Sequence, residues 1–443
     1  MKIESVLFSI LWIVAILYFL TWFVVIIIKR QAITVLSTSI VMNIFIPLFL
    51  MYPFTFSSMN IAATGSYAYS AYLDHIHEVF LISLIGTASV AIGALFAKQR
   101  SYLSKGNTAL KNVSQAILEL SRTKVLATYM FILCLIFLLM YYLGFFVEIY
   151  NGREFAMTNP TLRPISNLFY SLLPLFICLS LFSFYSGNKK SSVLFFLVGI
   201  FFSFTSGTRA AIFTGILMYL FAVLNVRSGK KNNLIKSIVI GFLFVFLAIY
   251  IGDIRDHQFN PLVSLSQLTI KILYGNNFSD LRDFAWVLSG WDKEFLYGKT
   301  ELAGIMSFIP SSVSSLRDEW GLGEVTTRII GYSSDTHPGL RPGIFGEAFL
   351  NFGYVGVVSF GFIYGFAIYK LHRFAQDSLS ENDRKDSLKN VLAAQVLCNM
   401  LINVMITAGF FSFYIMLFLI FVGFLLFKRK YHQRINLNNP SRR

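Results

Sequence analysis

The chain has 443 residues, of which 56% are hydrophobic and only 13% are charged, and its mean hydropathy is +0.65. A soluble domain carries about 25% charged residues, so this composition excludes a soluble globular protein. Apolar runs of about 20 residues recur along the chain and are continuous, which predicts membrane-spanning helices and excludes the alternating strands of a β-barrel.

The formal net charge of +15 does not indicate a nucleic-acid partner. The excess cations lie in short loops and in the C-terminal tail, where anchoring on the cytoplasmic side of a membrane explains them. The first apolar segment is too long and too poorly flanked for a cleaved signal peptide, so we expect it to remain as a helix. Cys134, Cys178 and Cys398 lie within apolar runs and offer neither a disulfide framework nor a metal-binding spacing.

The pattern of apolar runs predicts an all-α, polytopic integral membrane protein with eleven spans. Their ranges are 5–28, 33–52, 78–97, 125–147, 165–185, 191–205, 210–226, 236–252, 347–369, 390–407 and 410–427. One set of alternate loops, with the tail, holds 25 of the 37 Lys and Arg residues, whereas the other set holds 12, eight of them in one long loop. Because cation-rich short loops stay in the cytoplasm, we expect a cytoplasmic tail, and an N-terminus and long loop outside.

Four parts follow from these spans. They are an N-terminal transmembrane bundle (1–252), a large extracytoplasmic loop (253–346), the C-terminal spans (347–427) and a basic cytoplasmic tail (428–443). Within the first part, apolar residues recur at helical intervals from Leu110 to Leu120 in the cytoplasmic stretch 106–124. That stretch predicts an interfacial amphipathic helix or a plain helical hairpin.

The large loop is the only long polar interval between apolar blocks, and it contains 11 of the 22 acidic residues. Leu265, Leu268 and Ile272 lie at helical spacing, and 284–291 and 302–309 are further apolar patches. We therefore expect several short helices that lie at the membrane surface and cover a cavity. Any chemistry is expected here, where the chain leaves the bilayer and returns to it.

Two of the C-terminal spans carry patterns for helix packing. Gly361 and Gly365 form a small-xxx-small pair, which allows close contact between helices. Gln395, Asn399 and Asn403 are four residues apart and share one helix face. This amide stripe fits interhelical hydrogen bonding, and a sugar-lined cavity is the alternative.

Several motifs are absent, and this narrows the function. The sequence has no Gly-rich phosphate loop, no HExxH, no Cys/His metal spacing and no paired acidic motif that would hold a divalent metal under a nucleotide sugar. We therefore expect no metal and no cofactor. No span carries a charged residue near its centre, which argues against an ion-coupled transporter.

Arginines at the predicted outer surface are the main chemical signal. They are Arg209, Arg255, Arg282, Arg328 and Arg341. A guanidinium binds phosphate oxygens through two parallel hydrogen bonds and stays charged at any pH, which suits a lipid diphosphate at the interface. In glycosyl transfer, negative charge grows on the departing diphosphate, and fixed cations stabilise it without a metal. Arg209 also fits a snorkelling anchor.

An attacking sugar hydroxyl also needs a general base. His337, in THPGLRPG four residues before Arg341, is the leading candidate, and Asp335 and Glu347 are the alternatives. Each has a structural explanation as well: His337 can be a turn residue before Pro338, and Glu347 can compensate the dipole at the start of a span. The sequence leaves these possibilities open.

At these residues the sequence resembles the oligosaccharide repeat-unit polymerases, the O-antigen polymerases of the Wzy class. The stretches that carry the resemblance are SGTRAAI (206–212), IPSSV (309–313) and RPGIFGEAFLNFGYVG (341–356), and Arg328 to Gly339 fits an Arg, ten residues, Gly pattern. The resemblance covers the whole chain in layout and about thirty residues in motif. It implies a GT-C-like fold and a metal-independent glycosyltransferase of the bacterial inner membrane.

The substrates that the resemblance implies are undecaprenyl-diphosphate-linked oligosaccharides, which would be polymerised into O-antigen or capsule. It also suggests a chain-length regulator protein and membrane lipids as partners. The related O-antigen ligases have a similar layout and use lipid A core as acceptor, and GEAFLNFG favours the polymerase. A lipid-linked oligosaccharide flippase or other transporter is the alternative from a different class, but the sequence shows neither intramembrane cations nor a pseudo-repeat.

Overall fold

The structure of the protein is a computed structural model. The described residues are 2–28, 34–101, 108–146, 159, 162–205, 209–226, 265–275, 278–309, 313–332, 339–379 and 384–438. Every regular element in these ranges is a helix, and they contain no strand. The all-α prediction is therefore confirmed over the described part of the chain.

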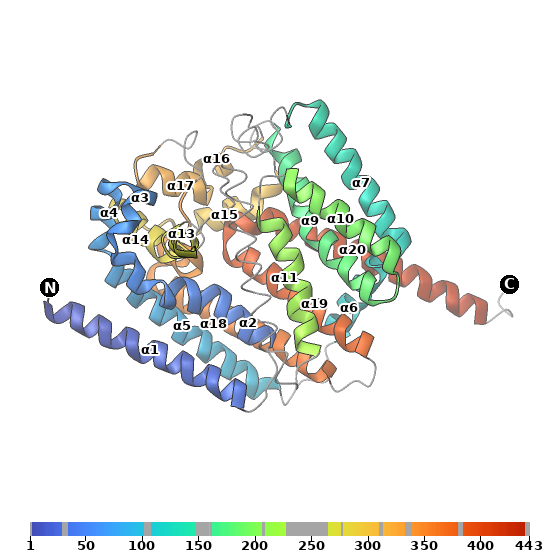
Figure 1. Ribbon diagram of the computed structural model, residues 1–443, viewed down its shortest axis with the longest axis horizontal. Helices are drawn as coiled ribbons and strands as arrows, with labels where there is room; N and C mark the ends of the chain where they lie inside the picture. Colours follow the sequence, from blue (N-terminus) through green and yellow to red (C-terminus); the bar gives the residue numbers. More distant parts are fainter. Residues whose placement is uncertain are drawn as a thin grey trace.

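The N-terminal half forms long helices joined by short helical pieces (Figure 1). The elements are α1 (Lys2–Ile28), α2 (Val35–Ile40), the π-helix η1 (Val41–Leu50), η2 (Tyr52–Phe56), η3 (Ser58–Asn60), α3 (Ile61–Thr64), α4 (Ser66–Leu73), α5 (Ile76–Ser101), α6 (Thr108–Leu120), α7 (Thr123–Tyr142), α9 (Arg163–Tyr185), α10 (Lys189–Thr205) and α11 (Arg209–Val226).

The predicted loop folds into short helices, and three longer helices follow it. They are α13 (Leu265–Leu273), α14 (Asp280–Gly290), α15 (Lys299–Ile305), η4 (Met306–Phe308), α16 (Leu316–Trp320) and α17 (Leu322–Ile329), then α18 (Gly343–Leu379), α19 (Arg384–Met405), η5 (Thr407–Gly409) and α20 (Phe410–Asn438). Helix α14 packs against α4, whereas α15, α16 and α17 pack against one another, with α15 nearer the centre of the molecule (Figure 1). Short helices are therefore present in the described part of the loop. That they lie at the outer membrane surface and cover a cavity stays a prediction.

Seven of the described helices are long and apolar enough to cross a membrane. Their apolar segments are Val35–Phe56, Ile76–Arg100, Thr123–Tyr142, Arg163–Tyr185, Gly343–Leu379, Lys385–Met405 and Phe410–Arg429. They coincide with seven of the predicted spans, and α1, α10 and α11 lie on three more. The chain is a multi-pass membrane protein. The span predicted at 236–252 lies outside the described residues, so the count of eleven stays a prediction.

Two boundaries differ from the prediction. The predicted span 347–369 is not one straight helix, because α18 breaks at Gly353, where φ is 60° and ψ is −149°. A Cβ at Gly356 would lie 2.3 Å from the carbonyl oxygen of Ala348, although residues eight apart in a straight helix are about 12 Å apart. The two halves of α18 therefore meet at a sharp bend. The predicted tail is also helical, because α20 continues to Asn438.

The helix predicted within 106–124 is confirmed as α6, and its apolar face contacts protein. Ile117 and Leu120 are buried, and a Cβ at Gly423 of α20 would lie 2.6 Å from the carbonyl oxygen of Ala116. The amide stripe on α19 does not form a hydrogen-bonded ladder among the described residues. Gln395 Nε2 is buried without a partner there, and Asn399 Nδ2 lies 3.7 Å from the sulfur of Met416.

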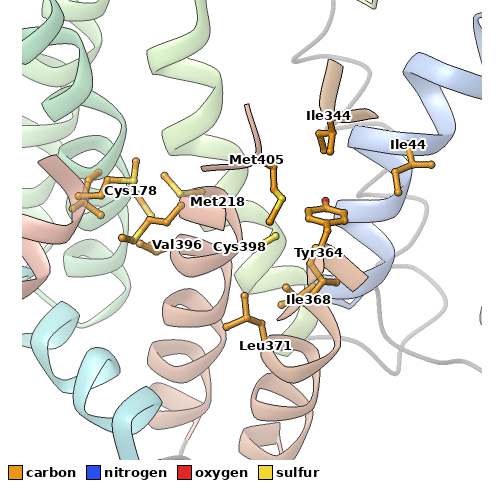
Figure 2. Packing of buried hydrophobic residues seen from close by; sticks show 14 of the residues in the cluster. Ile44, Cys178, Met218, Ile344, Tyr364, Ile368, Leu371, Val396, Cys398 and Met405 are labelled. Atoms are coloured by element: carbon orange, nitrogen blue, oxygen red, sulfur yellow. The ribbon is translucent and has the colours of Figure 1, made fainter. Parts of the chain in front are cut away.

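The core between these helices is apolar with isolated polar contacts. Figure 2 shows buried side chains that converge from five elements: Ile44 of η1, Cys178 of α9, Met218 of α11, Tyr364 of α18 and Met405 of α19. The hydroxyl oxygens of Tyr364 and Ser39 are 2.6 Å apart. This bond ties the second half of α18 to α2, because a buried hydroxyl needs a partner.

The closest helix pair is α18 with α5, and glycines make it possible. A Cβ at Gly365 would lie 2.0 Å from the carbonyl oxygen of Val90, and a Cβ at Gly361 would lie 2.7 Å from that of Gly86. A Cβ at Gly93 of α5 would likewise lie 2.1 Å from the carbonyl oxygen of Phe362 in α18. The prediction that Gly361 and Gly365 allow close helix contact is confirmed.

Gly365→Ala is expected to destabilise the protein, because the added methyl group would collide with backbone that cannot move away alone. Overpacking of this kind costs about 1–3 kcal/mol. Thermal unfolding of the purified protein in detergent measures the effect. Val355→Ile is the control, because it adds a methylene group to a side chain of the same helix that is 74% exposed. Equal melting temperatures for both variants would contradict the close packing of α5 and α18.

Candidate functional site

The site lies where the first half of α18 meets the loop helices. The chain enters α18 along α17: the Leu340 N–H donates to Thr326 Oγ1 over 3.0 Å, and a Cβ at Gly339 would lie 2.4 Å from the Cα of Gly323. Gly346 makes a second close contact, with α14, since a Cβ at this position would lie 2.9 Å from Cγ of Phe284. Residues 343–351 are all buried, and α14 and α17 cover part of this stretch.

The break in α18 is capped by the segment that leads into α15. The N–H groups of Leu296 and Tyr297 donate to the carbonyls of Leu350 and Asn351 over 2.9 and 3.0 Å. These carbonyls would otherwise accept from the next helical turn, which the break removes. The Gly298 N–H donates to Asn351 Oδ1 over 3.1 Å, and Gly298 itself is left-handed, with φ at 81°. Helix α15 starts at the next residue.

This cap brings two carboxyl groups together. Glu347, only 1% exposed, accepts hydrogen bonds from the Thr407 N–H over 3.0 Å and from the Thr407 hydroxyl. Glu301 of α15 lies beside it, and the hydroxyl of Thr300 donates to Glu301 Oε2 over 3.3 Å. Asn351 Nδ2 in turn donates to Thr300 Oγ1 over 2.7 Å. The pair is thus held by α15, α18 and η5.

The environment sets the protonation of Glu301. Burial and the nearby charge of Glu347 raise the pKa of Glu301 to about 7, while its own backbone and the Thr300 hydroxyl act to lower it. Like charges at short range disfavour the second ionisation. Glu301 therefore exchanges its proton near neutral pH, whereas an ordinary glutamate is fully ionised there.

Arg341 and Arg282 lie on either side of a pair of aspartates where α14 begins. Arg341 is exposed, and its charge acts on Asp280. Burial raises the pKa of Asp280 to about 6, the Arg341 guanidinium acts to lower it, and Asp283 raises it further. Asp283 pairs with Arg282 over 3.4 Å. Two of the predicted arginines are thus brought to the same end of α14.

Arg282 is enclosed by protein. It is 4% exposed, and its Nη1 donates to Asn60 Oδ1 over 3.3 Å and to the Tyr274 carbonyl over 3.1 Å. These contacts join η3 to the start of α14 across 222 positions of sequence. A diphosphate would have to displace them to reach Arg282, so its predicted role as a diphosphate ligand remains a prediction.

Arg328 lies apart from these residues, on an aromatic ring. Its Cζ is 5.0 Å from the centroid of Trp320, and Lys299 Nζ is 3.9 Å from the same centroid. Arg328 Nη1 also donates to the Glu319 carbonyl over 3.2 Å. Two exposed cations from α15 and α17 therefore share one indole through cation–π contacts.

The remaining predicted site residues lie outside the described side chains. Arg209 is the first residue of α11, but its side chain is not described. Arg255, Asp335 and His337 lie outside the described residues altogether. Their proximity to Arg341 or Glu347 stays a prediction.

Sequence reasoning missed Glu301, Thr300 and Thr407. Glu301 lies in KTELAG, which has no motif, and Thr407 is the last residue of the predicted span 390–407, where no chemical role was assigned to it. One signal was available: Glu347 and Asn351 are four residues apart in GEAFLN and so share a helix face. Two polar residues on one face of an apolar stretch require buried partners.

The chain matches a protein-family model. The family model described as "O-antigen polysaccharide polymerase Wzy" matches residues 2–382. This range includes most of the chain and the site residues of α14, α15, α17 and α18, but not Thr407. No curated protein and no solved structure matches.

Asn351→Leu is expected to loosen the site, because the side chain has the right size but cannot bond to Gly298 or Thr300. Each buried group left unpaired costs about 1–3 kcal/mol. A lower melting temperature and faster proteolysis between α14 and α15 are the expected results. Asn399→Leu is the matched control, since among the described residues its amide meets only the weak acceptor Met416. Unchanged stability in Asn351→Leu would contradict the capping role of the amide.

Proposed function

The chain belongs to the O-antigen polysaccharide polymerase Wzy family, and we propose on this basis that it is a glycosyltransferase that polymerises lipid-linked oligosaccharide repeat units. The single observation that carries the proposal is the family match over residues 2–382. The substrates would be undecaprenyl-diphosphate-linked oligosaccharides, and the product would be a surface polysaccharide such as O-antigen or capsule.

The reaction needs a cation where the diphosphate leaves. The hydroxyl of the incoming unit attacks the anomeric carbon of the growing glycan, and the bond to the diphosphate oxygen breaks. We propose that Arg341 holds the departing diphosphate, because its side chain is exposed and lies just before the start of α18. A guanidinium and a helix N-terminus both favour an anion at this position.

Other cations would extend this site. Arg328 and Lys299 present two exposed charges on Trp320, which suits a second phosphate or an acidic sugar. Arg209 and Arg255 are proposed as further diphosphate ligands from their sequence positions. Arg282 is proposed to contact the diphosphate only if its bond to Asn60 opens. Fixed cations of this kind stabilise leaving-group charge, so we propose that the transfer is metal-independent.

The proton of the attacking hydroxyl must go to a base. Glu347, Asp335 and His337 are the candidates from the sequence. The described site supports a carboxyl group in this role, because Glu347 and Glu301 are paired beside the break in α18. His337 and Asp335 precede Gly339 in the sequence, and Gly339 itself packs against Gly323 of α17.

The family match favours the polymerase over the alternatives. An O-antigen ligase would use lipid A core as acceptor, and a flippase or transporter would move its substrate without bond cleavage. We further propose that the protein lies in the bacterial inner membrane with the loop outside and the C-terminus in the cytoplasm, from the charge of its short loops. A chain-length regulator is proposed as a protein partner.

Arg341→Ala is expected to leave the protein in the membrane but to give glycans with a single repeat unit. Loss of one such donor lowers the rate about 10²–10³-fold. The measurement is the glycan length profile of a deletion strain that carries the variant. Arg163→Ala is the control, since Arg163 is an exposed arginine at the start of another span.

Three outcomes separate the functions. Single-repeat glycans in the deletion strain identify a polymerase, absence of surface glycan identifies a flippase, and free polymer that is not attached to lipid A core identifies a ligase. Long glycans at normal abundance in Arg341→Ala would contradict the role of this arginine.

A further inference from the structure

The two carboxyl groups of the site are not equivalent in their hydrogen bonding. Both oxygens of Glu347 accept hydrogen bonds from Thr407, and the side chain is 1% exposed. Glu301 accepts from Thr300 at Oε2, while its Oε1 is buried and meets no hydrogen-bond donor among the described residues. Of the pair, Glu301 therefore has the oxygen that can take up a proton or meet a hydroxyl group.

A carboxylate oxygen without a partner is costly in a buried place, because it has lost its water and gained nothing. Two changes relieve this cost: protonation of the carboxyl group, or the arrival of a donor. A sugar hydroxyl is such a donor. Because Oε1 is covered while Glu301 as a whole is partly exposed, the side chain must turn toward its exposed side for the two to meet. This hydrogen-bonding arrangement suits a general base that binds its proton donor only when the substrate is present.

From this geometry we propose that Glu301 is the general base of the transfer, with Glu347 as the positioning carboxylate behind it. The proposal rests on the polymerase function given above. The acceptor oxygen forms the new bond to the anomeric carbon, its proton moves to Glu301 Oε1, and the electron pair of the broken bond leaves on the lipid diphosphate. The proton then passes to water, so that no metal, oxidant or reductant is needed.

Glu301 is tuned for this role by its neighbours. Its pKa of about 7 arises from burial and from the charge of Glu347, and a base is most effective when its pKa is near the working pH. Paired carboxyl groups in different environments are a common way to divide such roles. The side chain can therefore accept a proton and release it again at neutral pH.

The described elements that contact α15 carry other charged or titratable groups. They are Arg317 and Glu319 of α16, Glu324 and Arg328 of α17, Tyr414 of α20 and Glu347 of α18. Arg317 donates to the Ser307 carbonyl, Arg328 to that of Glu319 and Tyr414 to that of Ile305. Among them, Glu347 is the group whose charge raises the pKa of Glu301.

The test uses the purified full-length chain in lipid nanodiscs, with lipid-linked single repeat units extracted from cells that lack it. The wild-type rate is expected to rise with pH through about 7, because a base must be unprotonated to act. Glu301→Gln keeps the shape but cannot take up the proton, so its rate should fall about 10²–10⁴-fold at every pH. Glu301→Asp should recover part of the activity.

Glu347→Gln provides a second, independent measurement. Its amide can still accept from the Thr407 N–H and donate to the Thr407 hydroxyl, so the fold should be kept. Removal of the negative charge lowers the pKa of Glu301, and the rising limb of the pH profile should move to lower pH. A purely structural role for the pair would leave the limb where it is in the wild type.

The outcomes distinguish the two proposals. If the wild-type protein does not extend the repeat units, the polymerase function fails. If the wild type is active, the role of Glu301 is overturned by either of two results: a Glu301→Gln variant with wild-type rate, or a Glu347→Gln variant with an unmoved pH limb. If Glu301→Gln does not fold, the Glu347→Gln profile alone decides.

Discussion

The site depends on one requirement, that backbone carbonyls freed by a helix break must find new donors. In a membrane protein this requirement is strict, because hydrocarbon offers no hydrogen bonds and irregular backbone is tolerated only where protein or a water-filled cavity surrounds it. The break at Gly353 frees the carbonyls of Leu350 and Asn351, and the N–H groups of residues 296 and 297 bond to them. The loop is thus fixed to α18 through backbone, whatever its other side chains are.

The distribution of charge along the first half of α18 follows from this fixation. Arg341, before the helix, is exposed beside the aspartates of α14, whereas Glu347 is buried against η5. The α15 start, set by Gly298, places Glu301 next to Glu347. Arg341 and Glu347 are six positions apart in the sequence. The proposed glycosyl transfer needs both a cation and a proton acceptor, since negative charge appears on the leaving group while a proton leaves the acceptor hydroxyl.

The sequence predicted those features that depend on a single property of the residues, such as hydropathy or small size. Hydropathy located the spans that the structure describes, and the Gly361–Gly365 pair located the closest helix contact. The sequence could not distinguish Gly353 from these packing glycines. The break in α18 depends on a positive φ at Gly353, and the residue type alone does not predict which glycine adopts it. Nor could the sequence separate Arg282 from Arg341: Arg282 is buried and bonds to Asn60, which is 222 positions away, whereas Arg341 is exposed.

The stretch GEAFLNFGYVG carries part of the family resemblance, and its glycines and polar residues have structural roles. Gly346 allows α14 to approach, since a larger residue would collide with Phe284, and Gly356 allows the second half of α18 to fold back on Ala348. Between them, Glu347 and Asn351 bond to Thr407 and Gly298. The two glycines thus allow close packing, and the two polar residues form buried hydrogen bonds. Together they hold the bent part of α18. A motif of this kind constrains the backbone around the carboxyl pair, while the sugars that the protein accepts would be selected by surfaces outside it.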